Sequence, residues 1–164
     1  MNHTTETIHP YRVTFRNDRM EVRENPENGE QALYAIKAFH AGDIISSFSA
    51  KSTSVVPSYL TVQTGDEQHI MLWPEHLQYC NHSCAPNVFF DTTRMQVVAL
   101  EHISAGTEMV FFYPSTEWSM KQPFACRCGN AACLGTIQGA MHIPQSVLSH
   151  YRLSDYILSK LRNR

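Results

Sequence analysis

Three cysteines lie within eight residues in the C-terminal third of the chain, in the order Cys126-Arg127-Cys128-Gly129-Asn130-Ala131-Ala132-Cys133. The spacing C-x-C-x4-C lets three thiolates face one ion, whereas a closed structural zinc site needs four protein ligands. The fourth ligand must come from elsewhere, so metal binding would tie two distant segments together. The chain has five cysteines, and an odd number argues against a closed disulfide framework. Three buried cysteines without a metal are the alternative interpretation.

A short polar segment, Tyr79 to Asn87, carries two amides, an imidazole, a hydroxyl and two thiols between two apolar stretches. Buried polar groups must be hydrogen-bonded or ligated, so this segment is either a satisfied turn or part of a site. Cys84 is its best candidate for the fourth zinc ligand. Cys80 and His82 are the alternatives.

The composition describes a globular protein of one domain: 164 residues, 43% hydrophobic and 17% charged. A net charge of −2 gives no reason to expect nucleic-acid binding. No apolar run approaches the roughly 18 residues of a membrane span, and residues 1–6 lack a signal-peptide pattern. We therefore expect an intracellular protein, cytoplasmic or nuclear, with reduced thiols.

Short apolar and β-branched stretches separated by turns predict a mainly β domain. Residues 1–10 are expected to be irregular. The predicted pairs are a strand or hairpin over 11–22, a hairpin of 32–36 with 44–48, a hairpin of 59–63 with 68–72, and a hairpin of 88–91 with 95–100. Residues 49–58 are rich in Ser, Thr, Val and Pro, and they predict a loop.

Met109 to Tyr113 is entirely apolar or aromatic and predicts a strand covered on both faces. Helical turns are predicted at 74–77 and 116–120. Behind a helix-starting proline, Pro144 to Leu161 has near-helical apolar spacing and predicts a C-terminal helix. This tail has three candidate roles: packing on the domain, covering a cofactor, or forming a homodimer contact.

The order of motifs resembles the SET-domain methyltransferases that carry a post-SET zinc cluster. The motifs are a hairpin with Gly-Asp-Ile, then N-H-S-C-x-P-N, then G-T-E-x-x-x-x-Y, then C-x-C-x4-C, and they span about Leu33 to Gly135. The resemblance implies a β-clip fold of small curved sheets with a pseudoknot, here with a C-terminal helix. It divides the chain into a SET domain at 11–121, a post-SET segment at 122–140 and a helical tail at 141–164.

The resemblance also implies an activity, which is transfer of a methyl group from S-adenosylmethionine to a lysine side chain of a protein or peptide. Tyr113 matches the catalytic tyrosine. Phe111 matches a position where Phe leaves room for two or three methyl groups and Tyr stops at one. Phe111, Phe112 and Tyr113 are expected to form an apolar wall that lowers the pKa of the lysine, about 10.4 when free, by desolvation.

The remaining site residues follow from the same resemblance. Zinc would be held by Cys84, Cys126, Cys128 and Cys133. The cofactor would meet Asn81, His82 and Tyr113, with Tyr59 and Trp118 lining its site and Phe124 and Leu134 covering its adenine.

The motif that bears on cofactor binding departs from the family, as does Phe112, which stands where the family has Asp before the catalytic tyrosine. Glu30-Gln31-Ala32 stands where the family has G-x-G, whose backbone meets the cofactor. Backbone contacts do not depend on side-chain identity, so these three residues are predicted to bind the cofactor. The freedom of glycine at positive φ is lost, however. The alternative function is a zinc-stapled binding module that is catalytically weak or inactive.

Overall fold

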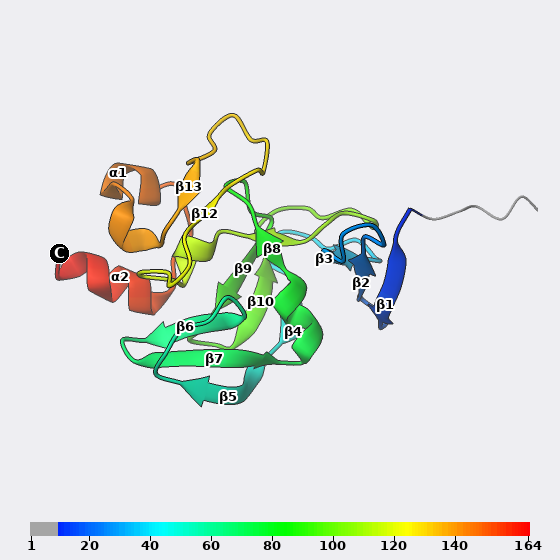
Figure 1. Ribbon diagram of the computed structural model, residues 1–164, viewed down its shortest axis with the longest axis horizontal. Coiled ribbons are helices and arrows are strands. Elements are labelled where there is room, and N and C mark those ends of the chain that lie inside the picture. Colours follow the sequence, from blue (N-terminus) through cyan, green and yellow to red (C-terminus); the bar gives the residue numbers. More distant parts are fainter. Residues whose placement is uncertain (1–9) are drawn as a thin grey trace, which may run out of the picture.

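The computed structural model describes residues 10–164. Residues 1–9, which make up most of the terminus predicted to be irregular, lie outside the described residues. Its strands form small sheets, as expected for a SET-type β fold. Figure 1 shows the N-terminal sheet on the right and two C-terminal helices on the left, with the other sheets between them. Sheet one is β1 (Arg12–Arg16), β2 (Met20–Glu24) and β3 (Gln31–Ala35). Sheet two is β4 (Ile44–Ser47), β10 (Gln96–Ala99) and β9 (Val88–Asp91). Sheet three is β5 (Ser49–Ser54), β7 (Gln68–Trp73) and β6 (Thr61–Gly65).

Three predicted hairpins are confirmed. β1 pairs with β2, β6 with β7, and β9 with β10, each antiparallel. In each case a short turn joins the two strands, and such local signals are readable from sequence. The short 3-10 helix η1 (Glu75–Tyr79) confirms the helical turn expected before the polar segment.

The predicted hairpin of 32–36 with 44–48 is wrong. β3 pairs with β2, while β4 pairs with β10. The connection between β3 and β4 instead forms a bridge from Phe39 to Ile103, so it leads the chain from one sheet to the next. Burial of Phe39 and Ile103, at 3% and 1% exposure, outweighs the local turn signal of Gly42 and Asp43.

The loop predicted at 49–58 is also wrong in its first part. Residues Ser49–Ser54 form the edge strand β5, which pairs with β7. All six residues are exposed, so this strand has no apolar alternation for sequence analysis to detect. Backbone hydrogen bonds to β7 define it.

The strand predicted at Met109 to Tyr113 is shorter than expected. β11 comprises only Val110–Phe111, and the 3-10 helix η2 (Tyr113–Ser115) follows. Pro114 has no N–H to donate to a strand, and its fixed φ suits the start of a helical turn. The helical turn expected at 116–120 therefore lies three residues earlier.

The single helix predicted from Pro144 to Leu161 is two helices, α1 (Gln145–Leu148) and α2 (Asp155–Arg162). Ser154 starts α2, because its hydroxyl accepts a hydrogen bond from the N–H of Ile157 at 3.2 Å. A second core cluster explains the fold of the tail: Phe112, Ala140, Ile143, Leu148, Leu153, Ile157 and Leu161 are buried together. The tail thus packs on the domain, and no helix in residues 10–164 is long and apolar enough to cross a membrane.

The remaining elements bring the motifs together. β8 (Asn81–His82) pairs parallel with β11, although 29 residues separate the paired positions Asn81 and Val110. β12 (Phe124–Ala125) pairs with β13 (Thr136–Ile137) and flanks the cysteine cluster. The 3-10 helix η3 (Ala140–His142) then leads into the tail. This threading of β8 beside β11 positions the site.

Candidate active site

The polar segment is held against β11 by hydrogen bonds. The N–H groups of Ser83 and Asn87 donate to the carbonyls of Phe111 and Val110 at 3.0 and 3.1 Å. The Asn87 side chain donates to the carbonyl of Glu108 at 2.8 Å and accepts from the N–H of Val110 at 2.9 Å. Asn87 is 7% exposed, so its amide is a satisfied structural clamp and not a ligand-binding group.

Asn81 joins this segment to β3. Its Nδ2 donates to the carbonyl of Gln31 at 2.9 Å, and its side chain also hydrogen-bonds the carboxylate of Glu108. Half-burial raises the pKa of Glu108, and the bond to Asn81 opposes that rise. The amide therefore links the Glu30–Ala32 segment, the polar segment and an acidic group.

His82 has a defined hydrogen-bonding pattern. Its Nδ1 accepts a hydrogen bond from the backbone N–H of Tyr113 at 3.1 Å, and its Nε2 lies 3.5 Å from the Cys84 sulfur. Because Nδ1 is an acceptor, the neutral ring carries its proton on Nε2 and donates toward that sulfur. Burial lowers the pKa of His82 to about 4, which keeps the ring neutral near pH 7.

Tyr113 lies at the centre of an aromatic group. Its ring is 4.7 Å from Phe111, 5.2 Å from His82 and 5.9 Å from Phe124 between centroids. Its hydroxyl donates to the carbonyl of Cys80 at 3.5 Å, a long and therefore weak bond. Burial raises the pKa of Tyr113 well above its usual value of 10.0, so the phenol keeps its proton.

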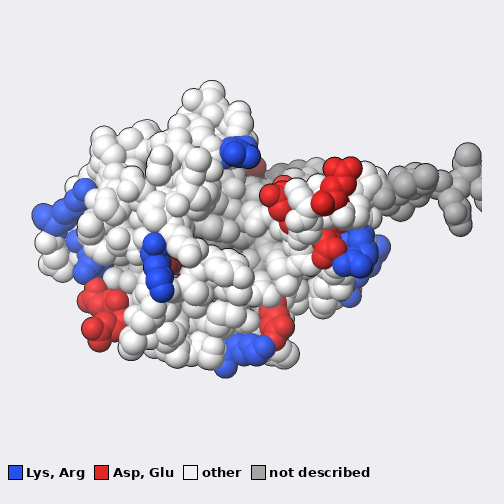
Figure 2. Space-filling model, viewed as in Figure 1, with Lys and Arg blue, Asp and Glu red and all other residues white. Residues whose placement is uncertain are grey.

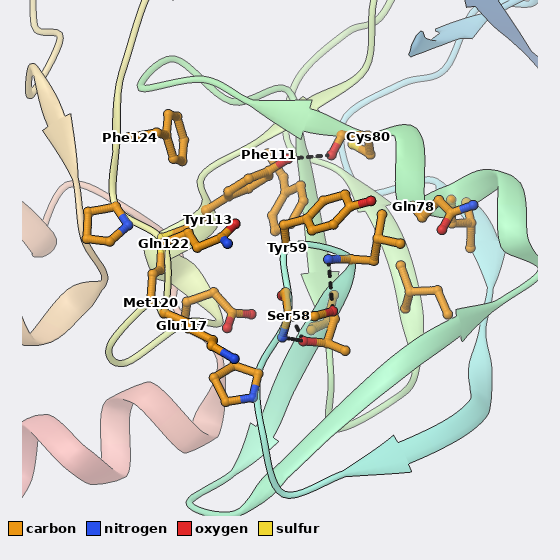
Figure 3. Close-up of a pocket in the computed structure, with 18 residues that line it drawn as sticks. Ser58, Tyr59, Gln78, Cys80, Phe111, Tyr113, Glu117, Met120, Gln122 and Phe124 are labelled. Carbon is orange, nitrogen blue, oxygen red and sulfur yellow. Dashed lines mark hydrogen bonds between the residues drawn. The ribbon is translucent and has the colours of Figure 1, made fainter. Parts of the chain in front are cut away.

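An apolar cavity of about 400 Å³ opens on one side of Tyr113. Figure 3 shows its labelled residues, among them Tyr59, Phe111, Glu117 and Phe124, around one space. Most of the wall is aliphatic or aromatic. Its lining includes Leu60, Val62, Leu72, Leu77, Phe111, Tyr113, Met120 and Phe124. We call it the Tyr59 cavity.

A wider and more polar cleft of about 790 Å³ is also lined by Tyr113. We call it the His82 cleft. It is lined by Glu30, Gln31, Asn81, His82, Ser83, Thr107, Glu108, Val110, Tyr113, Phe124, Cys126, Arg127 and Cys128. Tyr113 and Phe124 line both spaces, so the two cavities adjoin at these two rings.

Four cysteines form a candidate metal centre beside the His82 cleft. The sulfur atoms of Cys84, Cys126, Cys128 and Cys133 all lie within 4.8 Å of one another, and those of Cys84 and Cys126 are 3.9 Å apart. A tetrahedral zinc with Zn–S bonds of about 2.3 Å places its sulfurs about 3.8 Å apart. The four residues therefore fit zinc, and four thiolates leave no open coordination position. Cys80 is instead buried in the main core, where its thiol donates to the carbonyl of Met109.

The cysteines differ in how readily they ionise. Hydrogen-bond donation by the N–H of Asn130 lowers the pKa of Cys128 to about 6, whereas burial raises the pKa of Cys84 to about 12. The N–H of Leu134 donates to the Cys84 sulfur at 3.4 Å, and such a bond favours the thiolate. Zinc binds thiolates, so binding would release the proton that Cys84 holds.

The structure brings most of the predicted site residues together but not all. Glu30, Gln31, Asn81, His82, Tyr113 and Phe124 line the His82 cleft. Tyr59 lies in the other cavity, where it is 77% exposed. Trp118 and Leu134 pack on the tail cluster, and Ala32 lies in β3 between Gln31 and the core residue Leu33.

Phe112 does not belong to the apolar wall expected from Phe111, Phe112 and Tyr113. Successive side chains of an extended segment point to opposite faces, so Phe112 turns away from Phe111. Its ring stacks on Tyr151 at 3.7 Å between centroids and 8° between planes. The tyrosine hydroxyl donates to the carbonyl of Cys84 at 2.8 Å, so Phe112 helps dock the tail beside the metal centre.

Sequence reasoning missed two acidic residues. Glu108 lines the His82 cleft, and Glu117 lines the Tyr59 cavity at 7% exposure. Glu108 is part of the quoted G-T-E motif, so the motif itself was the available signal. Glu117 had only one hint, which was a charged residue four positions after Tyr113 in an otherwise uncharged stretch.

Small sheets, a parallel-paired polar motif and a four-cysteine centre define a SET-type domain. The chain belongs to the SET domain family, which matches residues 3–114. Methyltransferase flvH of Aspergillus flavus is 40% identical over 132 residues, covering 79% of this chain and 74% of that protein. Family and relatives together identify the protein as a methyltransferase.

Other relatives are much longer proteins. A histone-lysine N-methyltransferase, H3 lysine-36 specific, of Emericella nidulans is 40% identical over 68 residues, which are 38% of this chain and 7% of that protein. The protein of the same name from Coccidioides immitis is 36% identical over 80 residues, 44% of this chain and 8% of its own length. The chain therefore corresponds to a small part of these enzymes.

Proposed function

We propose that this protein transfers the methyl group of S-adenosylmethionine to the side-chain amine of a lysine in a protein or peptide. The observation that carries the proposal is the pair of cavities that adjoin at Tyr113 and Phe124. Methyl transfer is an in-line displacement, in which the attacking and leaving atoms lie on opposite sides of the methyl carbon. Two cavities that share Tyr113 and Phe124 in their linings would bring the cofactor and the amine close to each other, as that geometry requires.

The His82 cleft suits the cofactor, which supplies an electrophilic methyl group on a sulfonium. The polar lining offers amide and carboxylate groups at Asn81 and Glu108 for a charged amino-acid portion. Phe124 offers an aromatic face next to His82, with centroids 5.7 Å apart. Glu30 and Gln31 line the same cleft and would contribute backbone contacts to the cofactor.

The Tyr59 cavity suits an aliphatic amine. Its apolar wall would lower the pKa of an ammonium by desolvation, which favours the nucleophilic neutral amine. Tyr113 would orient the amine by accepting a hydrogen bond from its N–H, because the phenol proton is donated to the carbonyl of Cys80 and the nitrogen lone pair must stay free to attack. Phe111 lines the cavity beside Tyr113 and has no hydroxyl group, which leaves space for more than one methyl group on the amine.

Zinc would have a structural role. Three of the cysteines, Cys126, Cys128 and Cys133, follow soon after Phe124 in the sequence, and the fourth, Cys84, belongs to the polar segment. Zinc bound there would fix the Phe124 ring against Tyr113. We assign residues 11–121 to the SET domain, 122–140 to the post-SET segment and 141–164 to the tail on this basis.

A second candidate function is a zinc-stapled binding module with little or no catalysis. The observation favouring it is the Glu30–Ala32 segment, where the carbonyl of Gln31 already accepts a hydrogen bond from Asn81. A backbone segment that contains no glycine and whose carbonyl is already hydrogen-bonded has less freedom to rearrange around a cofactor.

Isothermal titration of the zinc-loaded protein with S-adenosylmethionine tests the proposal. We expect micromolar binding, and a cofactor at 100 times its Kd would add about 2.7 kcal/mol of stability. Methyl transfer is then followed by mass spectrometry, first with a histone H3 peptide spanning lysine 36, because several relatives carry that specificity in their names. The same peptide with arginine at that position is the control. A folded protein that binds no cofactor up to millimolar concentration would support the binding module.

A further inference from the structure

A carboxylate that forms no ion pair within residues 10–164 lies on the wall of the Tyr59 cavity. Glu117 is 7% exposed and lines this cavity, and Figure 3 shows its carboxyl end pointing into it, below the Tyr113 ring in that view. Its Oε1 accepts hydrogen bonds from the N–H of Gln63 at 2.9 Å and from the hydroxyl of Thr116 at 3.1 Å. Within residues 10–164 both hydrogen bonds go to Oε1, which leaves Oε2 for a ligand.

The carboxylate is held firmly from a second element. The Gln63 side chain accepts from the N–H of Trp118 at 2.9 Å and donates to the hydroxyl of Tyr156 at 3.1 Å. The Tyr156 hydroxyl in turn donates to Asp66 at 3.0 Å. Strand β6 and helix α2 therefore fix the position of Gln63, and Gln63 fixes Glu117. A carboxylate held in one position is suited to bind a ligand group that enters the cavity.

The groups that face Glu117 do not neutralise it. Tyr113 approaches from η2 and Tyr156 from α2, and burial raises the pKa of both phenols, so both stay uncharged. Cys80 lines the same cavity, and burial raises its pKa as well. Lys121 lines the cavity too, but no ion pair joins it or any other described cation to Glu117. A buried carboxylate in this setting favours a cation supplied from outside.

We propose that Glu117 is a catalytic residue that receives the substrate amine as an ammonium ion and removes one proton before methyl transfer. The inference rests on the proposed function and adds to it the acceptor of the proton. The ammonium R–NH3⁺ gives one proton to the carboxylate and becomes R–NH2. The nitrogen lone pair then forms the N–C bond as the S–C bond breaks, and that electron pair goes to sulfur. The proton on Glu117 returns to solvent before the next turnover.

The acidity of Glu117 suits this role. Burial raises its pKa to about 7, with the hydrogen bonds from Gln63 and Thr116 acting in the opposite direction. A general base works best when its pKa lies near the working pH. The apolar wall that raises the pKa of the acid would also lower that of a bound ammonium, so the two values approach each other.

A binding experiment tests the inference without turnover. The pKa of Glu117 is measured by NMR of the carboxyl carbon in glutamate-labelled protein, with and without Nα-acetyl-lysine amide. Because an ammonium prefers the ionised carboxylate, we expect the probe to lower the pKa of Glu117 by at least about one unit, a tenfold preference. The Nε-acetylated probe, which has no charge, should leave it unchanged. Equal pKa values with both probes would overturn the inference, even if methyl transfer is observed.

Kinetics provide the second test. We expect Glu117→Gln to lower kcat/KM about 100-fold at pH 7 and to recover activity as rising pH deprotonates the amine itself. Glu67→Gln removes the same charge from the exposed β6–β7 turn and should change neither rate nor pH profile. An unchanged profile in Glu117→Gln would exclude Glu117 as the base. Failure of the proposed function has a different signature, which is absence of cofactor binding in both variants and in the wild type.

Discussion

The backbone N–H of Tyr113 donates a hydrogen bond to Nδ1 of His82 at 3.1 Å. The other ring nitrogen lies 3.5 Å from the sulfur of Cys84. One neutral imidazole therefore joins the cysteine centre to the tyrosine that lines both cavities. A metal ligand that accepts a hydrogen bond is held in a fixed orientation, so order at the metal centre should be transmitted to Tyr113.

Tyr113→Phe should lower kcat about 100-fold and leave the affinity for S-adenosylmethionine within about twofold, since the loss concerns alignment of the amine. The ring contacts to Phe111 and Phe124 would persist because the phenyl ring is retained. Single-turnover rates and isothermal titration separate the two effects. Equal rates in variant and wild type would remove the hydroxyl from the mechanism.

Cys84→Ser should lower both the zinc content and the stability, because three thiolates and a serine hydroxyl form a much weaker zinc site. A loss of about 3 kcal/mol would lower the Tm by roughly 6–12 °C in a chain of this size. The matched control is Cys80→Ser, whose hydroxyl can still donate to the carbonyl of Met109. Zinc is measured by mass spectrometry of metals and the Tm by calorimetry. If Cys80→Ser lost the metal and Cys84→Ser kept it, the ligand assignment would be wrong.

The metal centre and the polar segment could be predicted from sequence because their chemistry is local. The three cysteines of C-x-C-x4-C leave a zinc site one ligand short. Cys84 lies in a segment whose buried polar groups must be hydrogen-bonded or ligated. Tight hairpins such as β9–β10 are equally local. In contrast, the pairing of β4 with β10 depends on a contact between residues about 50 positions apart, such as Ser46 and Val97. No turn or periodic signal encodes such a pairing.

Glu117 could not have been predicted for a related reason. Its burial depends on β6 and α2, which lie far from it in the sequence, through Gln63 and Tyr156. Its neighbours Thr116 and Trp118 form no motif. A charged residue in such a stretch is more often exposed than buried. Only the assembled cavity reveals that this carboxylate faces the space beside Tyr113.

Phe111→Tyr should reduce the number of methyl groups added to one lysine. Phe111 lines the Tyr59 cavity, and its ring centroids lie 4.7 Å from Tyr113 and 4.5 Å from Phe90. A hydroxyl added there would occupy space that a methylated amine needs and would offer it a hydrogen bond. Mass spectra of the product at completion should shift from di- or trimethylated to monomethylated peptide. An unchanged product distribution would show that Phe111 does not limit the methyl count.

Glu117 should also make stability depend on pH. Burial raises its pKa from 4.5 to about 7, so the folded state holds the proton more tightly than the unfolded state. Below pH 4.5 the side chain is protonated and neutral in both the folded and the unfolded state, so its burial does not lower the stability. Stability falls as the pH rises from 4.5 to 7, by about 3 kcal/mol in total. Glu117→Gln has no such proton to lose, and its amide oxygen can still accept the bonds from Gln63 and Thr116.

Calorimetry of wild type and Glu117→Gln at pH 5 and pH 8 checks this linkage. We expect similar Tm values at pH 5 and a variant more stable by roughly 6–12 °C at pH 8. The comparison cancels other titrating groups, including the cysteine centre, because both proteins contain them. A Tm difference that is the same at both pH values would mean that the carboxylate is not the source of the pH dependence. A gain in stability combined with the kinetic loss expected for the same variant would explain why a destabilising acid is kept in the cavity, since function and stability then act in opposite directions at one residue.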